Sequence, residues 1–336
     1  MRQFLRIVAC STLILSTTAC AHAPMASSDI AAFAAEMENK HQMPAAEIEQ
    51  LLKGTEFRDD IIAAITRPAE KTKAWYEYRP IFLKPDRIEG GVKFWRENEA
   101  LLDSVSKDYG IPPEILIAII GVETRYGQFT GRYRVLDSLA TLAFGYPPRA
   151  TFFRSELEQF LLLAREESVD PRIATGSYAG AMGKPQFISS SYRRYAVDRD
   201  GDGKRDLWAS NADVIASVAN YFKVHGWQPG EPITLRAEVE GAPDLQRFVD
   251  AGMKPSIPLR TLQADGVRPV DGSASPDPEM LSSLIKLDAG DHDEYWLGLN
   301  NFYVITRYNH SNLYAMAAYQ LSREIVAAKK AADAKP

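Results

Sequence analysis

Hydrophobic positions recur at helical spacing through most of the chain. Between Ser28 and Arg67 apolar residues return every three or four positions, with breaks near Pro44 and Gly54, and this pattern predicts helices. The segment 73–85, KAWYEYRPIFLKP, is aromatic and interrupted by proline, which predicts an extended connector. Helical spacing returns in six further segments, namely residues 86–109, 111–125, 136–144, 150–167, 213–225 and 311–331.

The pattern changes in the last third of the chain. Short β-prone stretches, ITLRAEVE and IPLRTL, alternate there with proline and glycine, and LGLNNFYVIT is strongly strand-like. We therefore expect a mainly α chain with a small β-containing insertion, an α+β fold. The expected regions are a helical part over 28–231, a β-containing subdomain over 232–300, and a C-terminal segment, helix and tail over 301–336.

Composition and charge narrow the class of protein. The 336 residues carry a formal net charge of −5, with ordinary apolar and charged fractions for a soluble globular protein. This balance offers no basic surface for nucleic acid and none for general attachment to anionic lipids. We expect neither DNA nor RNA as a partner.

The N-terminal residues 1–23 have the order of a secretory signal. Arg2 and Arg6 precede a short apolar segment and then small residues, and the apolar segment is too short to span a membrane. Cys20 either is lipidated, as in outer-membrane lipoproteins, or belongs to an ordinary cleaved signal. Cys10 and Cys20 are the two cysteines, so the exported body has no internal disulfide, and we expect it in the periplasm.

A single carboxylate follows the most apolar segment of the chain. In IPPEILIAIIGVE almost every residue after Glu114 is apolar, so we expect this helix to be buried on all sides, with Glu123 at its end. Burial and the negative end of the helix dipole both favour a raised pKa for Glu123, which suits a general acid. The alternative is a solvated carboxylate paired with a cation such as Arg125.

A second candidate segment is rich in glycine. The stretch GSYAGAMGKPQF, residues 176–187, is called the glycine-rich loop below. Its glycines allow close approach of a ligand to the backbone, while Ser177 and Gln186 offer hydrogen bonds. By composition alone it could equally be a structural connector.

Four ordered motifs resemble one family. GVETRYG is similar to the E-S-x-[FY]-G motif, and GSYAGAMGKPQF to the G-A-M-G-x-x-Q-F motif, of lytic murein transglycosylases of the MltB type. DGDGKRDLW and ITRYNHSNLYAMAAY also resemble segments of that family, so the similarity extends from about Phe33 to Leu321. Two departures are Thr124, in place of the usual serine, and ISSS, in place of M-P-S-S after Gln-Phe.

The resemblance implies a lysozyme-like helical core with a glycan-binding groove. It implies cleavage of the β-1,4 bond between N-acetylmuramic acid and N-acetylglucosamine in peptidoglycan, leaving a 1,6-anhydro end, with Glu123 as the single acid and then base. No organic cofactor is implied, and we expect a monomer. The residues that would hold the glycan are Ser177, Gln186, Phe187, Arg149, Tyr308, Asn309 and Tyr314.

The stretch VDRDGDGKRDLW, residues 197–208, is called the acidic loop below. Its alternating aspartates and the glycine at the sixth loop position follow the EF-hand pattern, but Ala209 replaces the bidentate glutamate at the twelfth position. A longer loop closed by a later aspartate, as in the related family, would bind Ca²⁺; Na⁺ or a solvated turn without an ion are the alternatives. The proposed ligands are Asp198, Asp200, Asp202, Asp213 and the carbonyl of Lys204.

Three functions remain open at this point. The chain could be a lytic transglycosylase, a hydrolytic muramidase that uses water in place of the substrate's C6 hydroxyl, or a peptidoglycan-binding scaffold without turnover. The intact Glu123, Ser177 and Gln186 disfavour the scaffold. The first two differ in their products, because no protein side chain supplies the attacking group.

Overall fold

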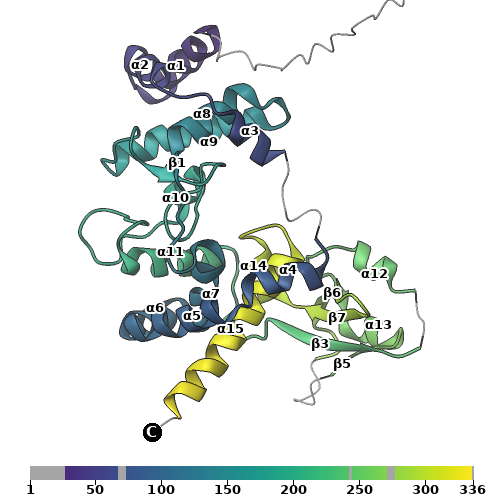
Figure 1. Cartoon of the computed structure of the whole chain (residues 1–336). Helices are drawn as coiled ribbons and strands as arrows, with labels where there is room; N and C mark the ends of the chain where they lie inside the picture. Colours follow the sequence, from purple (N-terminus) through teal and green to yellow (C-terminus); the bar gives the residue numbers. More distant parts are fainter. Residues whose placement is uncertain (1–26, 67–72, 242–243, 271–276, 335–336) are drawn as a thin grey trace, which may run out of the picture.

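The computed structural model describes residues 27–66, 73–241, 244–270 and 277–334. The segment 1–23, with the predicted signal and Cys20, lies outside these ranges, so both remain predictions. Within the described ranges, helices make up most of the chain and a small sheet projects from one side (Figure 1). No helix there is both long enough and apolar enough to cross a membrane.

The helices of the first half are α1 Ser27–His41, α2 Ala45–Lys53, α3 Asp59–Ile65, α4 Trp75–Phe82, α5 Pro85–Glu97, α6 Glu99–Tyr109, α7 Pro113–Thr124, α8 Val135–Gly145 and α9 Ala150–Glu166. Those that follow are α10 Ser189–Tyr195, α11 Asn211–Val224, α12 Gln246–Asp250, α13 Leu259–Ala264, α14 Asn300–Thr306 and α15 Asn312–Asp333. A short 3₁₀ helix, η2 Pro147–Arg149, connects α8 to α9. The predicted mainly α fold is therefore confirmed.

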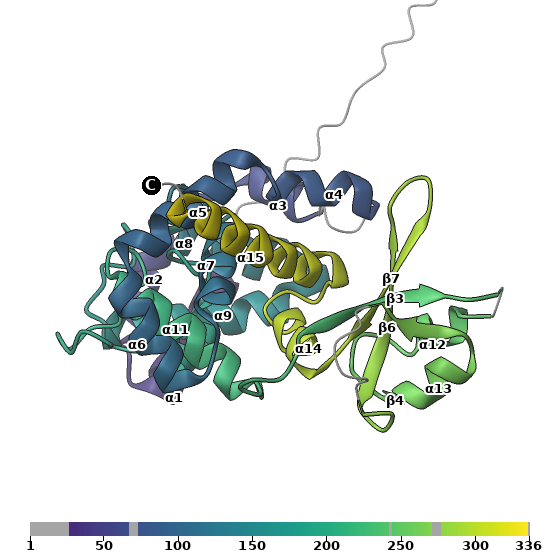
Figure 2. The same cartoon turned by 90° about the horizontal axis from the view of Figure 1, so that it is seen from below.

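Helix α7 lies at the centre of the helical part. It packs against α15, α5, α11 and α6, and its residues 115–121 are all buried. Seen from below, α15 runs alongside α5 and α4 (Figure 2). The C-terminal helix thus returns across the elements that precede α7, and it brings residues 312–333 against the helix that carries Glu123.

The β-rich part is a five-stranded antiparallel sheet. Its order is β4-β6-β7-β3-β5, and Leu284 pairs with Leu297 in the register of β6 and β7. Both leucines belong to a second hydrophobic cluster, which α12 and α13 complete. The strands are β3 Thr234–Val239, β4 Ile257–Pro258, β5 Val267–Pro269, β6 Leu281–Asp288 and β7 Asp293–Gly298, and a separate two-stranded pair joins β1 Tyr133–Arg134 to β2 Thr175–Gly176.

The prediction of an extended connector over residues 73–85 is wrong, because residues 75–82 form the helix α4. Trp75 and Tyr78, three positions apart, are buried on the same side of this helix. The carboxylate of Glu77 accepts a hydrogen bond from the Ala74 amide at the N-terminus. Burial of two large aromatic side chains outweighs the single hydrogen bond that Pro80 removes.

The long helix predicted over 86–109 is two helices, α5 and α6, that meet at Asn98. The Asn98 side chain donates to the Phe94 carbonyl (2.8 Å) and accepts from the Asn211 amide (2.9 Å). An asparagine that satisfies backbone and side-chain partners in this way competes with continuous helix hydrogen bonding. A tertiary contact to the start of α11 therefore fixes the break.

Two predicted strands are partly helical. LGLNNFYVIT leaves β7 after Gly298 and continues as α14, and IPLRTL leaves β4 after Pro258 and continues as α13. In α14 the fully buried Asn301 bonds to both the amide and the carbonyl of Gln228. This fixed polar contact, together with burial of Phe302, overrides the β propensity of the segment.

Candidate active site

Glu123 stands on the last turn of the buried helix α7. The prediction that this helix is buried on all sides is confirmed for Ile115 to Gly121. After Thr124 the chain leaves the helix through three consecutive left-handed residues, Arg125, Tyr126 and Gly127, with φ of 49°, 62° and 90°. Two non-glycine residues in this region cost free energy, and such strain concentrates at functional sites.

Tyr314 is a hydrogen-bond partner of Glu123. Its hydroxyl donates to Glu123 Oε1 at 2.6 Å. Burial, and then the negative charge of Glu123, raise the pKa of Tyr314 well above its ordinary value, so the phenol keeps its proton. The bond orients the carboxylate and stabilises its ionised form.

Tyr308 packs beside Tyr314. Its ring lies nearly parallel to that of Tyr314, with centroids 6.4 Å apart and an angle of 10°, and its hydroxyl donates to the Pro185 carbonyl at 2.7 Å. Burial raises the pKa of Tyr308 as well. Phe187 is buried behind this ring, with centroids 5.9 Å apart, and therefore supports Tyr308 from the protein interior.

The glycine-rich loop is a tight turn in which Ser177 and Gln186 bond to the loop's own backbone. Ser177 Oγ accepts from the amides of Ala179 and Ala181 at 3.2 and 3.0 Å. Gln186, at a left-handed φ of 52°, donates through Nε2 to the carbonyls of Thr130 and Gly183. Its amide oxygen and the Ser177 hydroxyl hydrogen are then the groups suited to a ligand.

Thr124 connects the end of α7 to the glycine-rich loop. Its hydroxyl lies 2.8 Å from the Lys184 carbonyl, to which it donates, and accepts from the Gly127 amide at 3.0 Å. The threonine that replaces the usual serine therefore still makes both bonds through its hydroxyl. Because Thr124 is buried, these bonds form away from competing water and hold Glu123 and the loop in one unit.

Two predicted glycan residues, Asn309 and Arg149, remain to be placed. Asn309 follows Tyr308 directly and is partly buried. Arg149 is exposed on η2, with its guanidinium 4.4 Å from the ring centroid of Phe152. The place of Arg149 in the glycan site stays a prediction.

The acidic loop brings three carboxylates together. Oxygens of Asp198, Asp200 and Asp202 lie within 4.8 Å of one another. Asp213 stands apart: it is buried, and its two oxygens accept the amides of Arg199 and Asp206, both at 2.8 Å. Burial raises the pKa of Asp213. The three clustered aspartates, of which Asp198 is partly buried and the other two are exposed, fit a hard cation, because carboxylate oxygens are the ligands that Ca²⁺ prefers.

Sequence reasoning missed the role of Tyr126. Its ring packs over Gly121, where a Cβ atom would lie 2.6 Å from the Tyr126 hydroxyl, and stacks on Phe94 with centroids 5.7 Å apart. The signal in the sequence was Gly121, an isolated glycine inside an otherwise aliphatic helix, which often marks close packing.

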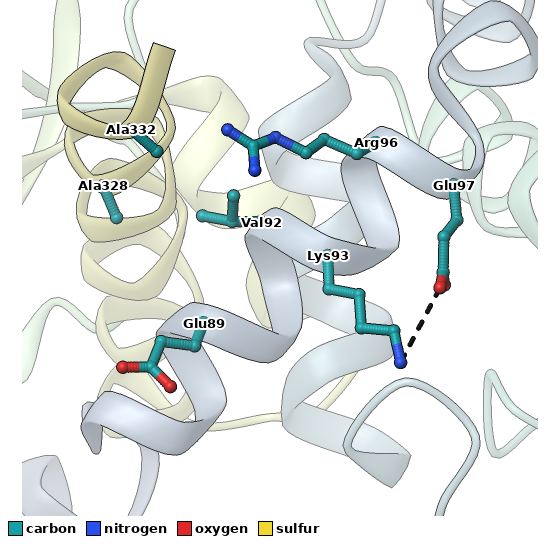
Figure 3. A pocket seen from close by; sticks show the side chains of 7 residues that line it. All are labelled: Glu89, Val92, Lys93, Arg96, Glu97, Ala328 and Ala332. Atoms are coloured by element: carbon teal, nitrogen blue, oxygen red, sulfur yellow. Dashed lines mark ion pairs between the residues drawn. The ribbon is translucent and has the colours of Figure 1, made fainter. Parts of the chain in front are cut away.

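A pocket of about 360 Å³ between α5 and α15 belongs to a different part of the surface (Figure 3). Val92 and two alanines of α15 form its apolar floor, and charged side chains of α5 surround it. None of the predicted glycan or metal residues lines it. It therefore has no part in the candidate site.

A central buried helix that ends in one hydrogen-bonded glutamate, beside tyrosines and a tight glycine-rich loop, defines a lysozyme-like domain. The transglycosylase SLT domain family matches residues 26–323, and the chain belongs to this family. The membrane-bound lytic murein transglycosylase B of Escherichia coli is 43% identical over 306 residues, 88% of this chain and 82% of that protein.

Solved structures agree with this assignment. The soluble lytic transglycosylase SltB1 from Pseudomonas aeruginosa is 47% identical, with a TM-score of 0.82 over 90% of this chain and 99% of that one. The Escherichia coli lytic transglycosylase Slt35 in complex with calcium is 42% identical, with a TM-score of 0.81 over 92% and 95%. The lysozyme-like fold expected from the motifs is thus confirmed.

Proposed function

We propose that the protein is a lytic murein transglycosylase that cleaves the β-1,4 bond between N-acetylmuramic acid and N-acetylglucosamine. It is an enzyme of the lytic transglycosylase family, and peptidoglycan glycan strands are its substrate. The observation that carries the proposal is the pair of Glu123 and Tyr314 at the end of α7. One oriented carboxylate next to neutral tyrosines suits a reaction in which the substrate supplies its own nucleophiles.

In the proposed mechanism Glu123 acts twice. The protonated carboxyl donates to the leaving glycosidic oxygen, while the 2-acetamido group of the substrate stabilises the positive centre at C1. The resulting carboxylate then removes the C6 hydroxyl proton as that oxygen bonds to C1, which gives the 1,6-anhydro end and returns the proton to Glu123. Tyr314 holds the carboxylate through both steps.

The glycan would be held by the groups around this pair. We assign hydrogen bonding to the Ser177 hydroxyl, the Gln186 amide oxygen and Asn309, ring contacts to Tyr308, and an outer contact to Arg149. Phe187 would act by supporting Tyr308. Ser177→Ala and Gln186→Ala should each lower kcat/KM on isolated sacculi; wild-type values for both would remove the glycine-rich loop from the groove.

Calcium is proposed as a structural ion. Asp198, Asp200 and Asp202 fit Ca²⁺ by donor type and spacing, and a relative has been solved in complex with calcium. When bound, the ion would neutralise the crowded carboxylates and fix the acidic loop. The Lys204 carbonyl remains a candidate ligand, and Asp213 would orient the loop through its two backbone bonds.

An envelope location follows from the substrate and from the membrane-bound relative. We further propose that residues 1–23 direct export and that Cys20 carries a lipid anchor in the outer membrane. Fractionation of wild type and Cys20→Ala tests the anchor. If mature wild-type protein is found in the soluble periplasmic fraction, the lipid anchor is rejected and only export remains.

The test of the main proposal combines Glu123→Gln with product analysis. The amide keeps the shape of the side chain but cannot donate the required proton, so the rate on sacculi should fall about 100-fold or more with folding retained. Mass analysis of wild-type products should show muropeptide ends lighter by one water than reducing ends. Reducing ends would indicate a muramidase, and an active Glu123→Gln variant would reject Glu123 as the catalytic acid.

A further inference from the structure

Arg87 is a buried arginine on α5 that reaches the end of the helix carrying Glu123. Only 7% of the residue is exposed. Its Nη1 lies 3.1 Å from the Gly121 carbonyl, to which it donates, and 3.4 Å from the Val122 carbonyl. The Val122 carbonyl belongs to the peptide bond that contains the amide nitrogen of Glu123. One cation is thus placed directly behind the last turn of α7.

This cation has no carboxylate partner in an ion pair within the described ranges. Burial, reinforced by repulsion from Arg125, lowers the pKa of Arg87, which shows that its position is electrostatically costly. Two features offset the cost. The carbonyls at the end of α7 form the negative pole of the helix, and the ring of Phe82 lies 5.1 Å from the guanidinium.

The contact between α5 and α7 is built to accommodate this arrangement. The Tyr126 hydroxyl donates to the backbone carbonyl of Arg87 at 2.8 Å. Its ring occupies space that exists only because three neighbours are glycine: a Cβ atom at Gly90, Gly91 or Gly121 would lie 2.9, 2.8 or 2.6 Å from Tyr126 atoms. An arginine on the protein surface would not require two helices to pack this closely.

We propose that Arg87 is a positioning residue for glycan cleavage: it fixes the last turn of α7, and its charge offsets the negative pole of the helix that carries Glu123. This inference rests on the proposed role of Glu123 and assigns a second residue to it. The carboxylate forms when Glu123 donates its proton, so a fixed positive charge stabilises the state that follows bond cleavage.

Other ionisable groups also surround this end of α7, and they stay unchanged in the variants proposed below. They are Tyr314 and Tyr308 from the C-terminal part, Tyr78 from α4, Asp86 from the start of α5, and Arg125 and Tyr126 from the turn after α7.

The direction in which the pH–rate profile should shift follows from the positive charge of Arg87. Without the cation, ionised Glu123 is less stable and holds its proton to higher pH. The alkaline limb of the pH–rate profile, which reports loss of the proton from the general acid, should then move upward. A residue that only held α5 to α7 would lower the melting temperature and leave this limb in place.

The experiment compares Arg87→Gln, which keeps a donor but removes the charge, with Arg87→Lys, which keeps the charge. The control is Arg96→Gln on the same helix, because Arg96 is exposed, pairs with Asp333 at 2.8 Å and lies beside the pocket between α5 and α15 (Figure 3). Release of soluble fragments from sacculi is measured across a pH series, below the melting transition of each variant.

We expect Arg87→Gln to lower the maximal rate about tenfold and to shift the alkaline limb upward by about 0.5 pH unit or more. Arg87→Lys should keep the limb of the wild type, and Arg96→Gln should match the wild type in both respects. An unshifted limb in folded Arg87→Gln, or an equal shift in Arg87→Lys, would overturn the proposal. If Arg87→Gln does not fold, Arg87→Met, which keeps a long side chain and removes the charge, replaces it, and an unshifted limb in folded Arg87→Met would equally overturn the proposal.

Failure of this inference is distinguishable from failure of the proposed function. If Glu123→Gln is inactive and the alkaline limb of folded Arg87→Gln is unshifted, only the role of Arg87 is rejected. An active Glu123→Gln would remove the basis of both proposals.

Discussion

The hydroxyl of Tyr314 donates a hydrogen bond to Glu123 Oε1 over 2.6 Å, although 191 positions separate the two residues in the sequence. The bond joins α15, near the C-terminus of the chain, to the end of the central helix α7. Tyr314 is itself fixed, because it lies in the first turn of α15 and its amide bonds to Ser311 Oγ at the N-cap. The orientation of the carboxylate therefore depends on how α15 packs.

The first prediction removes this bond. Tyr314→Phe keeps the buried ring and deletes the hydroxyl, so the melting temperature should change little while kcat falls about tenfold or more, as expected for a hydrogen bond to a charged group. Turnover on isolated sacculi and thermal unfolding provide the two measurements. Tyr303→Phe on α14 is the control. Equal kcat in Tyr314→Phe and the control would show that the bond has no part in turnover.

The second prediction concerns the connection between α7 and the glycine-rich loop. Thr124→Val keeps the shape but leaves the Lys184 carbonyl and the Gly127 amide without their partner, at a cost of about 1–3 kcal/mol for each group left unsatisfied. We expect a melting temperature lower by several degrees and a lower kcat. Thr124→Ser, which retains the hydroxyl, is the matched control. If the valine variant melts and turns over like the serine variant, the connection is unimportant.

The third prediction concerns calcium. A ligand that binds only the folded state stabilises it by about 2.7 kcal/mol at one hundred times its Kd, so Ca²⁺ should raise the melting temperature of metal-free protein by a few degrees. Asp202→Ala should abolish this increase, and the exposed Asp103→Ala should retain it. Thermal unfolding and calorimetric titration with Ca²⁺ measure the effect. No heat of binding and no shift in the wild type would refute the site.

The fourth prediction concerns pH and His225, which ends α11 and stacks on Tyr221 with centroids 4.0 Å apart. Burial, with repulsion from Arg307 and Arg194, lowers the pKa of His225 below the ordinary value near 6.5. The unfolded chain therefore binds a proton more readily than the folded protein, and stability should fall as the pH drops from neutral through about 6.5 and below.

His225→Gln keeps a side-chain donor for the Tyr221 carbonyl and cannot titrate in this range. Its melting temperature should depend less on pH between neutral and mildly acidic conditions than that of the wild type. The slopes are compared, not the absolute values, because the variant also loses ring stacking. Equal slopes would show that His225 contributes nothing to acid sensitivity.

Much of the candidate site could be predicted from short stretches of sequence. The apolar run before Glu123 determined that a buried helix would present one carboxylate at its end, since no polar side of that helix exists to face water. The glycine-rich loop and the three alternating aspartates were likewise visible, because tight turns depend on residue types a few positions apart. Most helices followed from periodicity alone.

Other local patterns were misleading. The aromatic, proline-containing segment 73–85 and the β-branched residues near Phe302 predicted extended structure, whereas burial of Trp75 and the bonds of Asn301 make both segments helical. Propensities of a few tenths of a kcal/mol per residue are smaller than the free energy of burying an aromatic side chain. Tertiary packing therefore decided those elements.

The sequence by itself determined that this protein has a helical core, a lone carboxylate after its most apolar helix, a tight glycine-rich loop and an acidic turn, because each depends on residues that are near neighbours in the chain. Only the tertiary structure decided the contacts of Glu123 and its helix: Tyr314 bonds to the carboxylate, Arg87 bonds to the Gly121 carbonyl in the last turn of α7, and Thr124 bonds to the Lys184 carbonyl of the glycine-rich loop. These contacts join segments that are distant in the sequence. They could not be predicted from the sequence, because side-chain periodicity specifies which face of a helix is buried but not which other helix will cover it.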